Sequence, residues 1–303
     1  MSRAERDVAR GLIEKGELGR TPAQQRASFN ERFATRPLGD DVTLTDRTLG
    51  GVPALDVQVD GANGDGVILY LHGGAYVIGS ARTGANLAAP LSRRSGVPAV
   101  SLQYRLAPEH PFPAGVDDAL AAYRELVESG RSVVIVGDSA GGGLALATLL
   151  AARRGGLPQP VGAVLFSPWT DLTLSGMSMD ARGDYDPLFD RERMAESAGF
   201  YLAGQDPRDE LASPLFADLT GLPPLLIQVG SAEVLLDDSL RLAVRAAEQE
   251  VDVSLDVVAG APHVYQLFAG MLPEADEALD RASAFITKRL SETRTHSGAV
   301  GSS

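Results

Sequence analysis

The sequence predicts an α/β fold in which a mostly parallel central sheet is flanked by helices. Short runs of β-branched and apolar residues recur from residue 67 onward, with helical stretches between several of them. These runs are apolar throughout, which is typical of strands covered by helices on both faces. No linker rich in Gly, Ser or Pro and no internal repeat divides the chain. We therefore expect residues 1–303 to form a single domain.

The expected elements can be placed in order along the chain. Helices are expected at Asp117–Glu128, Ala140–Arg154, Asp238–Glu250 and Ala275–Leu290. The glycine pair at residues 50 and 51 separates the first two strands, which indicates a hairpin. The expected strands are Val42–Thr48, Ala54–Val59, Val67–Leu71, Ala99–Gln103, Val133–Val136, Val161–Phe166, Leu225–Val229 and Val253–Val258.

Two segments lie outside this alternation. Residues 1–38 favour helices broken near Thr21-Pro22, and Phe29 and Phe33 are spaced to share one face of the second helix. No strand is expected from about residue 171 to 221, although this stretch holds several Met and aromatic residues. An insertion of that length between two strands is usually functional or a small subdomain. We expect an appended cap there, whose Met and aromatic residues line a substrate pocket or form the cap's own small core.

Composition excludes several function classes. The formal net charge of −13 argues against nucleic acid or an anionic membrane surface as partner, because both would be repelled. The chain has no cysteine and four histidines, so disulfides and thiolate sites are excluded, and no metal or cofactor is implied. The N-terminus mixes charges of both signs without a signal-peptide pattern, and no window has the apolar length of a membrane span. We expect a cytoplasmic protein.

One expected strand runs directly into a glycine-rich turn. Val133–Val136 is followed by Gly137-Asp138-Ser139-Ala140-Gly141 and then by an Ala/Leu-rich helix. A serine hydroxyl is a poor nucleophile, and a tight strand-to-helix turn exposes it to a base and to the helix N-terminus. Large side chains two residues to either side would clash, and both positions are glycine. Ser139 is therefore the predicted nucleophile; the alternative is a structural turn capped by Ser or Asp.

A second glycine-rich loop follows strand Val67–Leu71 and reads His72-Gly73-Gly74-Ala75-Tyr76. Glycines after a strand let N–H groups face a ligand without a Cβ in the way. The N–H groups of Gly73, Gly74 and Ala140 are expected to form an oxyanion hole for a tetrahedral intermediate. The alternative is an ordinary Gly-Gly turn. His72 itself is interpreted as a structural residue that holds the loop by hydrogen bonds.

The base is found by elimination among the four histidines. In a hydrolase with this strand–turn–helix serine, the acid and then the histidine follow the serine, at the ends of later strands. That order excludes His72 and His110, and His296 lies in a polar tail where nothing would hold a base. His263 follows strand Val253–Val258 and precedes an apolar helix start. It is the predicted general base, and a structural loop histidine is the alternative.

The acid is expected in the loop after strand Leu225–Val229. Glu233 is the first carboxylate beyond that strand and suits the role of orienting His263 and stabilising its cation. Asp237 and Asp238 are expected to cap the following helix and to interact with its dipole. Asp237 stays open as an alternative acid.

Together these residues resemble the hormone-sensitive-lipase family of esterases, called family IV among the bacterial enzymes, which have the α/β-hydrolase fold. The similarity extends over about Val67 to Phe268. The resemblance implies that the loop at residues 72–75 forms the oxyanion hole and that Ser139 is the nucleophile. The motif that is highly specific to the family is Tyr104-Arg105-Leu106-Ala107-Pro108-Glu109-His110-Pro111-Phe112-Pro113-Ala114. The resemblance implies that this motif, with Glu109 and His110, is scaffold.

The resemblance has further implications. Members of the family carry a cap built from N-terminal helices and an insertion, which corresponds here to residues 1–40 and about 171–212. Relatives commonly dimerise through the last strand and its helix, so a homodimer is allowed. The family usually has Asp-Pro-Leu in the acid loop, whereas this chain has Glu233-Val234-Leu235. A glutamate is one methylene longer, so the loop must retreat to keep the same contact with His263.

The predicted function is hydrolysis of carboxylic esters through Ser139, His263 and Glu233, with an acyl-enzyme intermediate. Short to medium acyl esters are favoured because of the resemblance and because no apolar lid suited to a lipid surface is visible. The fold also hosts other acyl-transfer reactions. The alternatives are a deacylase acting on an amide or an acetylated xenobiotic, and a small-molecule-binding protein on an inactive hydrolase scaffold.

Overall fold

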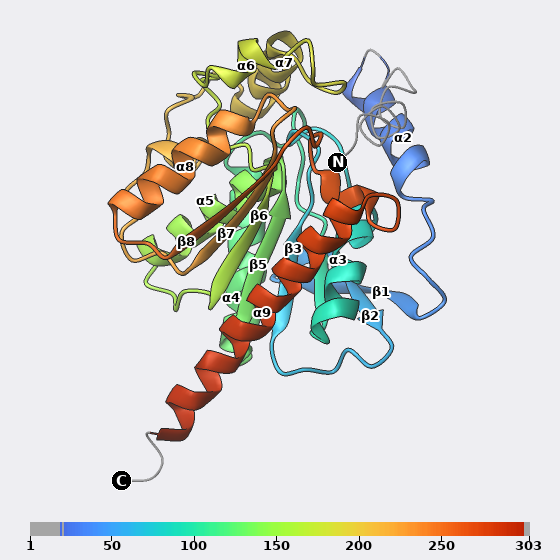
Figure 1. Ribbon diagram of the computed structural model, residues 1–303, viewed down its shortest axis with the longest axis vertical. Helices are drawn as coiled ribbons and strands as arrows, with labels where there is room; N and C mark the ends of the chain where they lie inside the picture. The colour runs from blue at the N-terminus through green and yellow to red at the C-terminus, as the bar shows by residue number, and fades with distance from the viewer. Residues whose placement is uncertain (1–18, 20, 300–303) are drawn as a thin grey trace.

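The computed structural model describes residue 19 and residues 21–299 of the 303-residue chain. An eight-stranded sheet lies at its centre, in the order β1-β2-β4-β3-β5-β6-β7-β8 (Figure 1). β1 and β2 form an antiparallel hairpin, β2 is antiparallel to β4, and the other neighbouring strands are parallel. The predicted mostly parallel sheet is confirmed. The strands are β1 Val42–Leu49, β2 Val52–Val59, β3 Val67–Leu71, β4 Ala99–Leu102, β5 Val133–Asp138, β6 Gly162–Phe166, β7 Leu225–Gly230 and β8 Val253–Val258.

Helices cover both faces of the sheet, so the central strands are buried on both sides. In β3, Val67, Leu69 and Leu71 belong to one core, whereas Ile68 and Tyr70 belong to the other. This alternation follows from the two-residue period of a strand. The helices α4 (Ala114–Glu128), α5 (Ala140–Arg154) and α8 (Leu236–Glu248) pack on the first face, and α3 (Ala81–Ser95) and α9 (Pro273–Ala299) on the second (Figure 1).

Helix α3 is not among the helices expected from the sequence, because Gly84 and Pro90 interrupt its pattern. It forms nevertheless because its ends are capped. The side chains of Ser80 and Thr83 each accept a hydrogen bond from the other's backbone N–H, and Gly96 closes the helix in a left-handed conformation. A Cβ at position 84 would lie 2.5 Å from the Ser101 Oγ, so glycine lets α3 approach the sheet closely.

The N-terminal helix α2 (Pro22–Phe33) begins where the sequence predicts a break, with Thr21 as its N-cap. The helix predicted before Thr21 lies outside the described residues. α2 buries no side chain completely and is held mainly by polar contacts. The Arg26 guanidinium donates to the carbonyls of Val77 (2.7 Å) and Ala107 and pairs with Glu109. These contacts place α2 over the loops that follow β3 and β4.

The insertion between β6 and β7 contains α6 (Ser178–Ala181), α7 (Arg191–Leu202) and the short 3-10 helix η1 (Pro214–Phe216), and no strand, as predicted. α6 and α7 lie at the same end of the molecule as α2 (Figure 1). The Ser178 Oγ donates to the Val234 carbonyl in the loop after β7 (2.6 Å), and Tyr201 stacks on Tyr76 at 3.8 Å between ring centroids. The insertion therefore lies at the carboxyl ends of the parallel strands.

No helix among the described residues is both long enough and apolar enough to cross a membrane.

Candidate active site

The turn between β5 and α5 places Ser139 where a strand ends and a helix begins. Ser139 has φ 54° and ψ −122°, a conformation that residues other than glycine rarely adopt. Its N–H donates to the Phe166 carbonyl at the end of β6, and its carbonyl accepts from the Trp169 N–H. Contacts with the end of β6 and with the segment that follows it therefore hold both the N–H and the carbonyl of the strained residue.

Glycine is required on either side of this turn. A Cβ at Gly137 would lie 2.2 Å from the Gly141 carbonyl oxygen, and a Cβ at Gly141 would lie 2.0 Å from the Leu71 carbonyl oxygen. Real side chains do not approach backbone atoms so closely. The steric reason given from the sequence for these two glycines is confirmed.

Glu233 and His263 are in direct contact, although 30 positions separate them along the chain. The Glu233 Oε2 accepts a hydrogen bond from the His263 Nδ1, and both side chains are buried. Donation from Nδ1 leaves Nε2 of a neutral imidazole as a proton acceptor. Burial lowers the pKa of His263, but the charge and hydrogen bond of Glu233, with Asp186 and Asp138, outweigh it and leave that pKa raised.

The loops that carry the two residues are also joined by their backbones. The Ala232 N–H donates to the Ala261 carbonyl (3.1 Å), and the Gly260 N–H donates to the Ser231 Oγ (2.8 Å). A Cβ at Gly230 would lie 2.1 Å from the Ala261 oxygen, so glycine is needed where the loops cross. This close approach brings a glutamate into contact with the histidine.

Ser167 is a residue of this site that sequence reasoning missed. It follows β6, has a positive φ of 47° and is fully buried. Its Oγ donates to the Glu233 Oε1 (2.8 Å) and accepts from the Val264 N–H (3.2 Å), while the Gly230 N–H also donates to Oε1 (3.0 Å). Ser167 thus links the acid to the histidine loop. Because it directly follows Phe166, which holds the Ser139 N–H, the site is continuous from Ser139 to His263.

The loop after β3 is ordered by its own hydrogen bonds. His72 is buried, its Nδ1 bonds the Gly73 carbonyl (2.8 Å), and its ring stacks on Tyr104. Burial lowers the pKa of His72 to about 4, so its ring is neutral at pH 7. The interpretation of His72 as a structural residue that holds this loop is confirmed.

Asp138, next to Ser139, accepts a hydrogen bond from one N–H group of this loop. Its Oδ1 accepts hydrogen bonds from the Tyr70 hydroxyl (2.7 Å) and from the Gly73 N–H (3.0 Å). The Gly73 N–H is therefore already engaged. Within the described chain, the N–H groups of Gly74, Ala75 and Ala140 have no such acceptor. The sequence analysis expects the N–H groups of Gly73, Gly74 and Ala140 to act together as an oxyanion hole. In the structure the Gly73 N–H is bonded to Asp138, a contact that the sequence could not reveal.

Asp237 and Asp238 do not cap α8, so the expectation of capping is wrong, although both lie in the first turn of that helix as the dipole interaction requires. The N-cap position of α8 is Leu235 and has no side-chain hydrogen bond. The Asp237 Oδ2 accepts from the Ser178 N–H (3.0 Å), and the Asp238 Oδ2 accepts from the N–H groups of Thr170 (2.7 Å) and Asp171 (2.9 Å). Both carboxylates bind the insertion because its backbone supplies unpaired donors close to α8. Neither bonds His263.

The remaining candidates lie apart from the Glu233–His263 pair. His110 is exposed, and Glu109 pairs with Arg26 of α2. Arg105 pairs with Asp118 of α4 (2.7 Å), which ties the family-specific motif to the body of the fold. The side chain of His296 lies outside the described residues. Among the residues that are described, no three His, Asp or Glu side chains gather in a way that could hold a metal ion.

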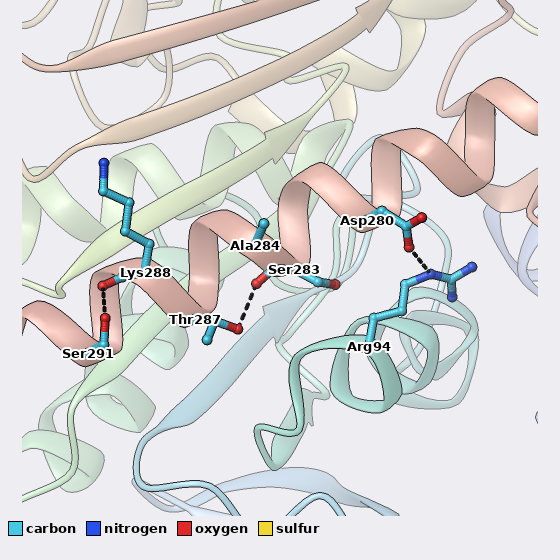
Figure 2. Close-up of a pocket in the computed structure, with 7 residues that line it drawn as sticks. All are labelled: Arg94, Asp280, Ser283, Ala284, Thr287, Lys288 and Ser291. Carbon is cyan, nitrogen blue, oxygen red and sulfur yellow. Dashed lines mark hydrogen bonds and ion pairs between the residues drawn. The ribbon is translucent and has the colours of Figure 1, made fainter.

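Two hollows are formed by the described residues, one beside the loop after β3 and one along α9. A cavity of about 30 Å³ beside the loop after β3 is bounded by Phe29 and Phe33 of α2 and by His72, Gly73 and Asp138. A second, open hollow of about 610 Å³ follows the outer side of α9, where Arg94 of α3 pairs with Asp280 (Figure 2). Figure 2 shows hydroxyl side chains along this hollow, and none of the site candidates borders it. The first cavity touches the loop after β3 and Asp138, but neither hollow is bordered by Ser139, Glu233 or His263.

A sheet of this topology, with a strained serine after the central strand β5 and a histidine–carboxylate pair in the loops after β7 and β8, defines an α/β-hydrolase. Residues 68–267 match the family described as alpha/beta hydrolase fold. An acetyl-hydrolase of Streptomyces hygroscopicus is 45% identical over 249 residues, which are 78% of this chain and 83% of that protein. An esterase of Acinetobacter venetianus is 35% identical over 88% of this chain and 92% of its own.

The solved structures give the same result. The crystal structure of an esterase from the bacterial hormone-sensitive lipase family superposes with a TM-score of 0.92, at 43% identity, over 95% of this chain and 99% of that one. The chain belongs to the bacterial hormone-sensitive lipase family and is a serine esterase.

Proposed function

We propose that the chain hydrolyses carboxylic esters of short to medium acyl length, with Ser139 as nucleophile, His263 as general base and Glu233 as the acid of the triad. The observation that carries the proposal is the buried hydrogen bond between the Glu233 Oε2 and the His263 Nδ1. It fixes the tautomer in which the His263 Nε2 can accept a proton. The contacts of Asp237 with Ser178 support Glu233, not Asp237, as the acid.

In this proposal the reaction has two halves. The His263 Nε2 takes the proton of the Ser139 hydroxyl as Oγ attacks the ester carbonyl, and the imidazolium then protonates the departing alcohol. Water attacks the resulting acyl-enzyme, with His263 again accepting the proton, and the free acid leaves. Glu233 stabilises the imidazolium in both halves because its carboxylate is buried against Nδ1.

The oxyanion of each tetrahedral intermediate requires N–H donors. We assign this role to Gly74 and Ala140, whose N–H groups are unengaged in the described chain, and to Ala75, the next residue of the loop. Gly73 takes a different part, because its N–H holds the Asp138 carboxylate at 3.0 Å. In this arrangement Asp138 fixes the loop that follows β3 relative to the serine turn.

The preference for short acyl chains is supported by the acetyl-hydrolase of Streptomyces hygroscopicus, whose name indicates a small acyl group. Comparing p-nitrophenyl acetate, butyrate and palmitate tests this: kcat/KM should fall from the short esters to palmitate, and a rise toward palmitate would contradict the proposal.

The test of the nucleophile and base uses a covalent probe as well as turnover. A fluorophosphonate should label the wild-type chain at Ser139, and Ser139→Ala should abolish both labelling and ester hydrolysis. His263→Ala should lower kcat by about 10⁵-fold or more while the folded state, monitored by circular dichroism, is retained. Wild-type protein that neither reacts with the probe nor hydrolyses esters would favour a binding protein on a hydrolase scaffold.

Three expectations about organisation are part of the proposal. We propose one domain over residues 1–303 with a cap formed by residues 1–40 and about 171–212, and a cytoplasmic location; the resemblance allows a homodimer. The positions of α2, α6 and α7 at the carboxyl ends of the strands support the cap. Size-exclusion chromatography with light scattering measures the oligomeric state.

A further inference from the structure

A third carboxylate, from the insertion, reaches the acid loop. Asp186 lies between α6 and α7, is 7% exposed, and bonds three backbone N–H groups. Its Oδ1 accepts from Leu188 (2.9 Å) and Phe189 (3.1 Å), and its Oδ2 accepts from Val234 (3.0 Å). Val234 directly follows Glu233. One buried side chain therefore joins the insertion to the backbone of the catalytic acid.

The turn that Asp186 holds ends on the histidine. The ring of Phe189 meets the ring of His263 edge to face, with centroids 5.1 Å apart and planes at 89°. Leu188, beside it, packs on the apolar cluster of Tyr265 and Phe268 that follows the histidine loop. The insertion thus contacts His263 through residues whose backbone N–H groups Asp186 bonds.

The charge of Asp186 also acts on the pair. Asp186, Glu233 and Asp138 are the acidic groups whose charges raise the pKa of His263, against the effect of burial. Asp186 is buried and accepts three N–H donors, and an acceptor-only carboxylate satisfies all three. No cation pairs with Asp186 among the described residues. Burial raises the pKa of Asp186, whereas the positive charge of protonated His263 and the N–H groups of Leu188 and Val234 act in the opposite direction and favour the carboxylate.

We propose that Asp186 is a positioning residue for ester hydrolysis: it fixes Phe189 against His263 and places a second negative charge beside the Glu233–His263 pair. This inference rests on the proposed function. In consequence, the insertion does more than border the substrate. It helps to set the pH at which the base is ready and the orientation of the imidazole ring.

The experiment is the pH dependence of kcat/KM with p-nitrophenyl acetate. Asp186→Asn keeps the size of the side chain and removes the charge, so the acid limb should move to lower pH by about half a unit. Asp186→Ser keeps an oxygen acceptor for the turn and should move the limb in the same direction; it also serves if the Asn variant does not fold. Thermal unfolding by circular dichroism monitors the fold of each variant.

Two controls separate charge from packing. Phe189→Leu removes the ring and keeps the carboxylate, so kcat should fall several-fold while the acid limb stays in place. Asp180→Asn removes an exposed carboxylate of the same insertion, one that pairs with Arg191. This variant should leave both kcat and the acid limb as in wild type. An acid limb that does not move in folded Asp186 variants of an active enzyme overturns this inference alone. A wild-type chain that lacks both turnover and fluorophosphonate labelling overturns the proposed function with it.

Discussion

The serine turn and the Glu233–His263 pair are built on different principles. The turn is a contiguous segment, and backbone sterics fix it: Gly137 and Gly141 lie where any Cβ would meet a carbonyl oxygen. The pair joins two loops, and side chains from other elements fix it, namely Ser167 after β6 and Asp186 from the insertion. A single substitution in the turn should therefore lower the stability of the fold sharply. Removing one support of the pair at a time should instead lower kcat step by step.

The largest expected effect tests the centre of the pair. Glu233→Gln should lower kcat by about a thousandfold, because the neutral amide keeps the size of the side chain but cannot stabilise the imidazolium. Asp237→Asn is the matched control and should retain nearly all activity, since Asp237 bonds Ser178 and not His263. Steady-state kinetics with p-nitrophenyl butyrate measures both. The reverse order would move the acid to Asp237.

The next effect tests the steric account of the turn. Gly141→Ala should cost about 3 kcal/mol of stability or more, because its Cβ would lie 2.0 Å from the Leu71 oxygen. Gly199→Ala, inside α7, has open space around its Cβ and should be neutral or stabilising by up to about 1 kcal/mol. Urea unfolding measures both. Equal stabilities would show that the turn can relax around a methyl group.

A third effect is the pH dependence of stability that arises from Asp238, in the first turn of α8. Burial raises the pKa of Asp238 from its ordinary 3.8 to about 7. The stability linked to this raised pKa is fully present below about pH 4 and is lost as the pH rises through about 7. The loss of stability from pH 5 to pH 8 should therefore be smaller in Asp238→Asn than in wild type, by about 2 kcal/mol.

The control for that measurement is Asp60→Asn, which alters an exposed carboxylate at the end of β2. It should leave the loss from pH 5 to pH 8 as in wild type. If Asp238→Asn loses as much stability as wild type over this range, Asp238 is ionised in the folded protein well below pH 7. The insertion would then be attached to α8 by a charged carboxylate.

The smallest effect tests one support of the pair. Ser167→Ala removes the hydroxyl that donates to the Glu233 Oε1 and should lower kcat by about tenfold, the equivalent of one hydrogen bond to a charged group. Ser92→Ala is the matched control, because Ser92 is also buried and its Oγ has no hydrogen-bond partner in the described chain. Activity equal to wild type would assign the positioning of Glu233 to the Gly230 N–H alone.

The sequence predicts the sheet and the turn because both depend on neighbours in the chain. Apolar runs such as Val133–Val136 become strands, and the glycines flanking Ser139 report their own steric need. Helix α3 was not expected, since its stability comes from caps and from the close approach at Gly84. Ser167 has no signal in the sequence, because its role depends on a residue 66 positions away.

The contrast between neighbours in the chain and distant contacts also explains which roles of the acidic residues could be predicted. The sequence predicts Glu233 as the partner of His263 because it is the first carboxylate after β7, and its Oε2 accepts a hydrogen bond from the His263 Nδ1. Asp237 and Asp238 look like helix caps because they open α8, yet the N–H groups that donate to them belong to the insertion. Asp186 lies in a stretch whose conformation no periodicity indicates. Contacts between distant segments, and not local preference, decide the role of each of these carboxylates.

In helix α2, one set of residues borders a cavity and another residue anchors the helix to the rest of the fold. Phe29 and Phe33 border the cavity beside the active-site loop, yet no residue of α2 is fully buried in the hydrophobic cores. Arg26 anchors the helix to backbone carbonyls, which do not change when side chains do. Substitutions at Phe29 and Phe33 should therefore cost less stability than substitutions of fully buried core residues, so the border of this cavity can be varied with a limited effect on the fold.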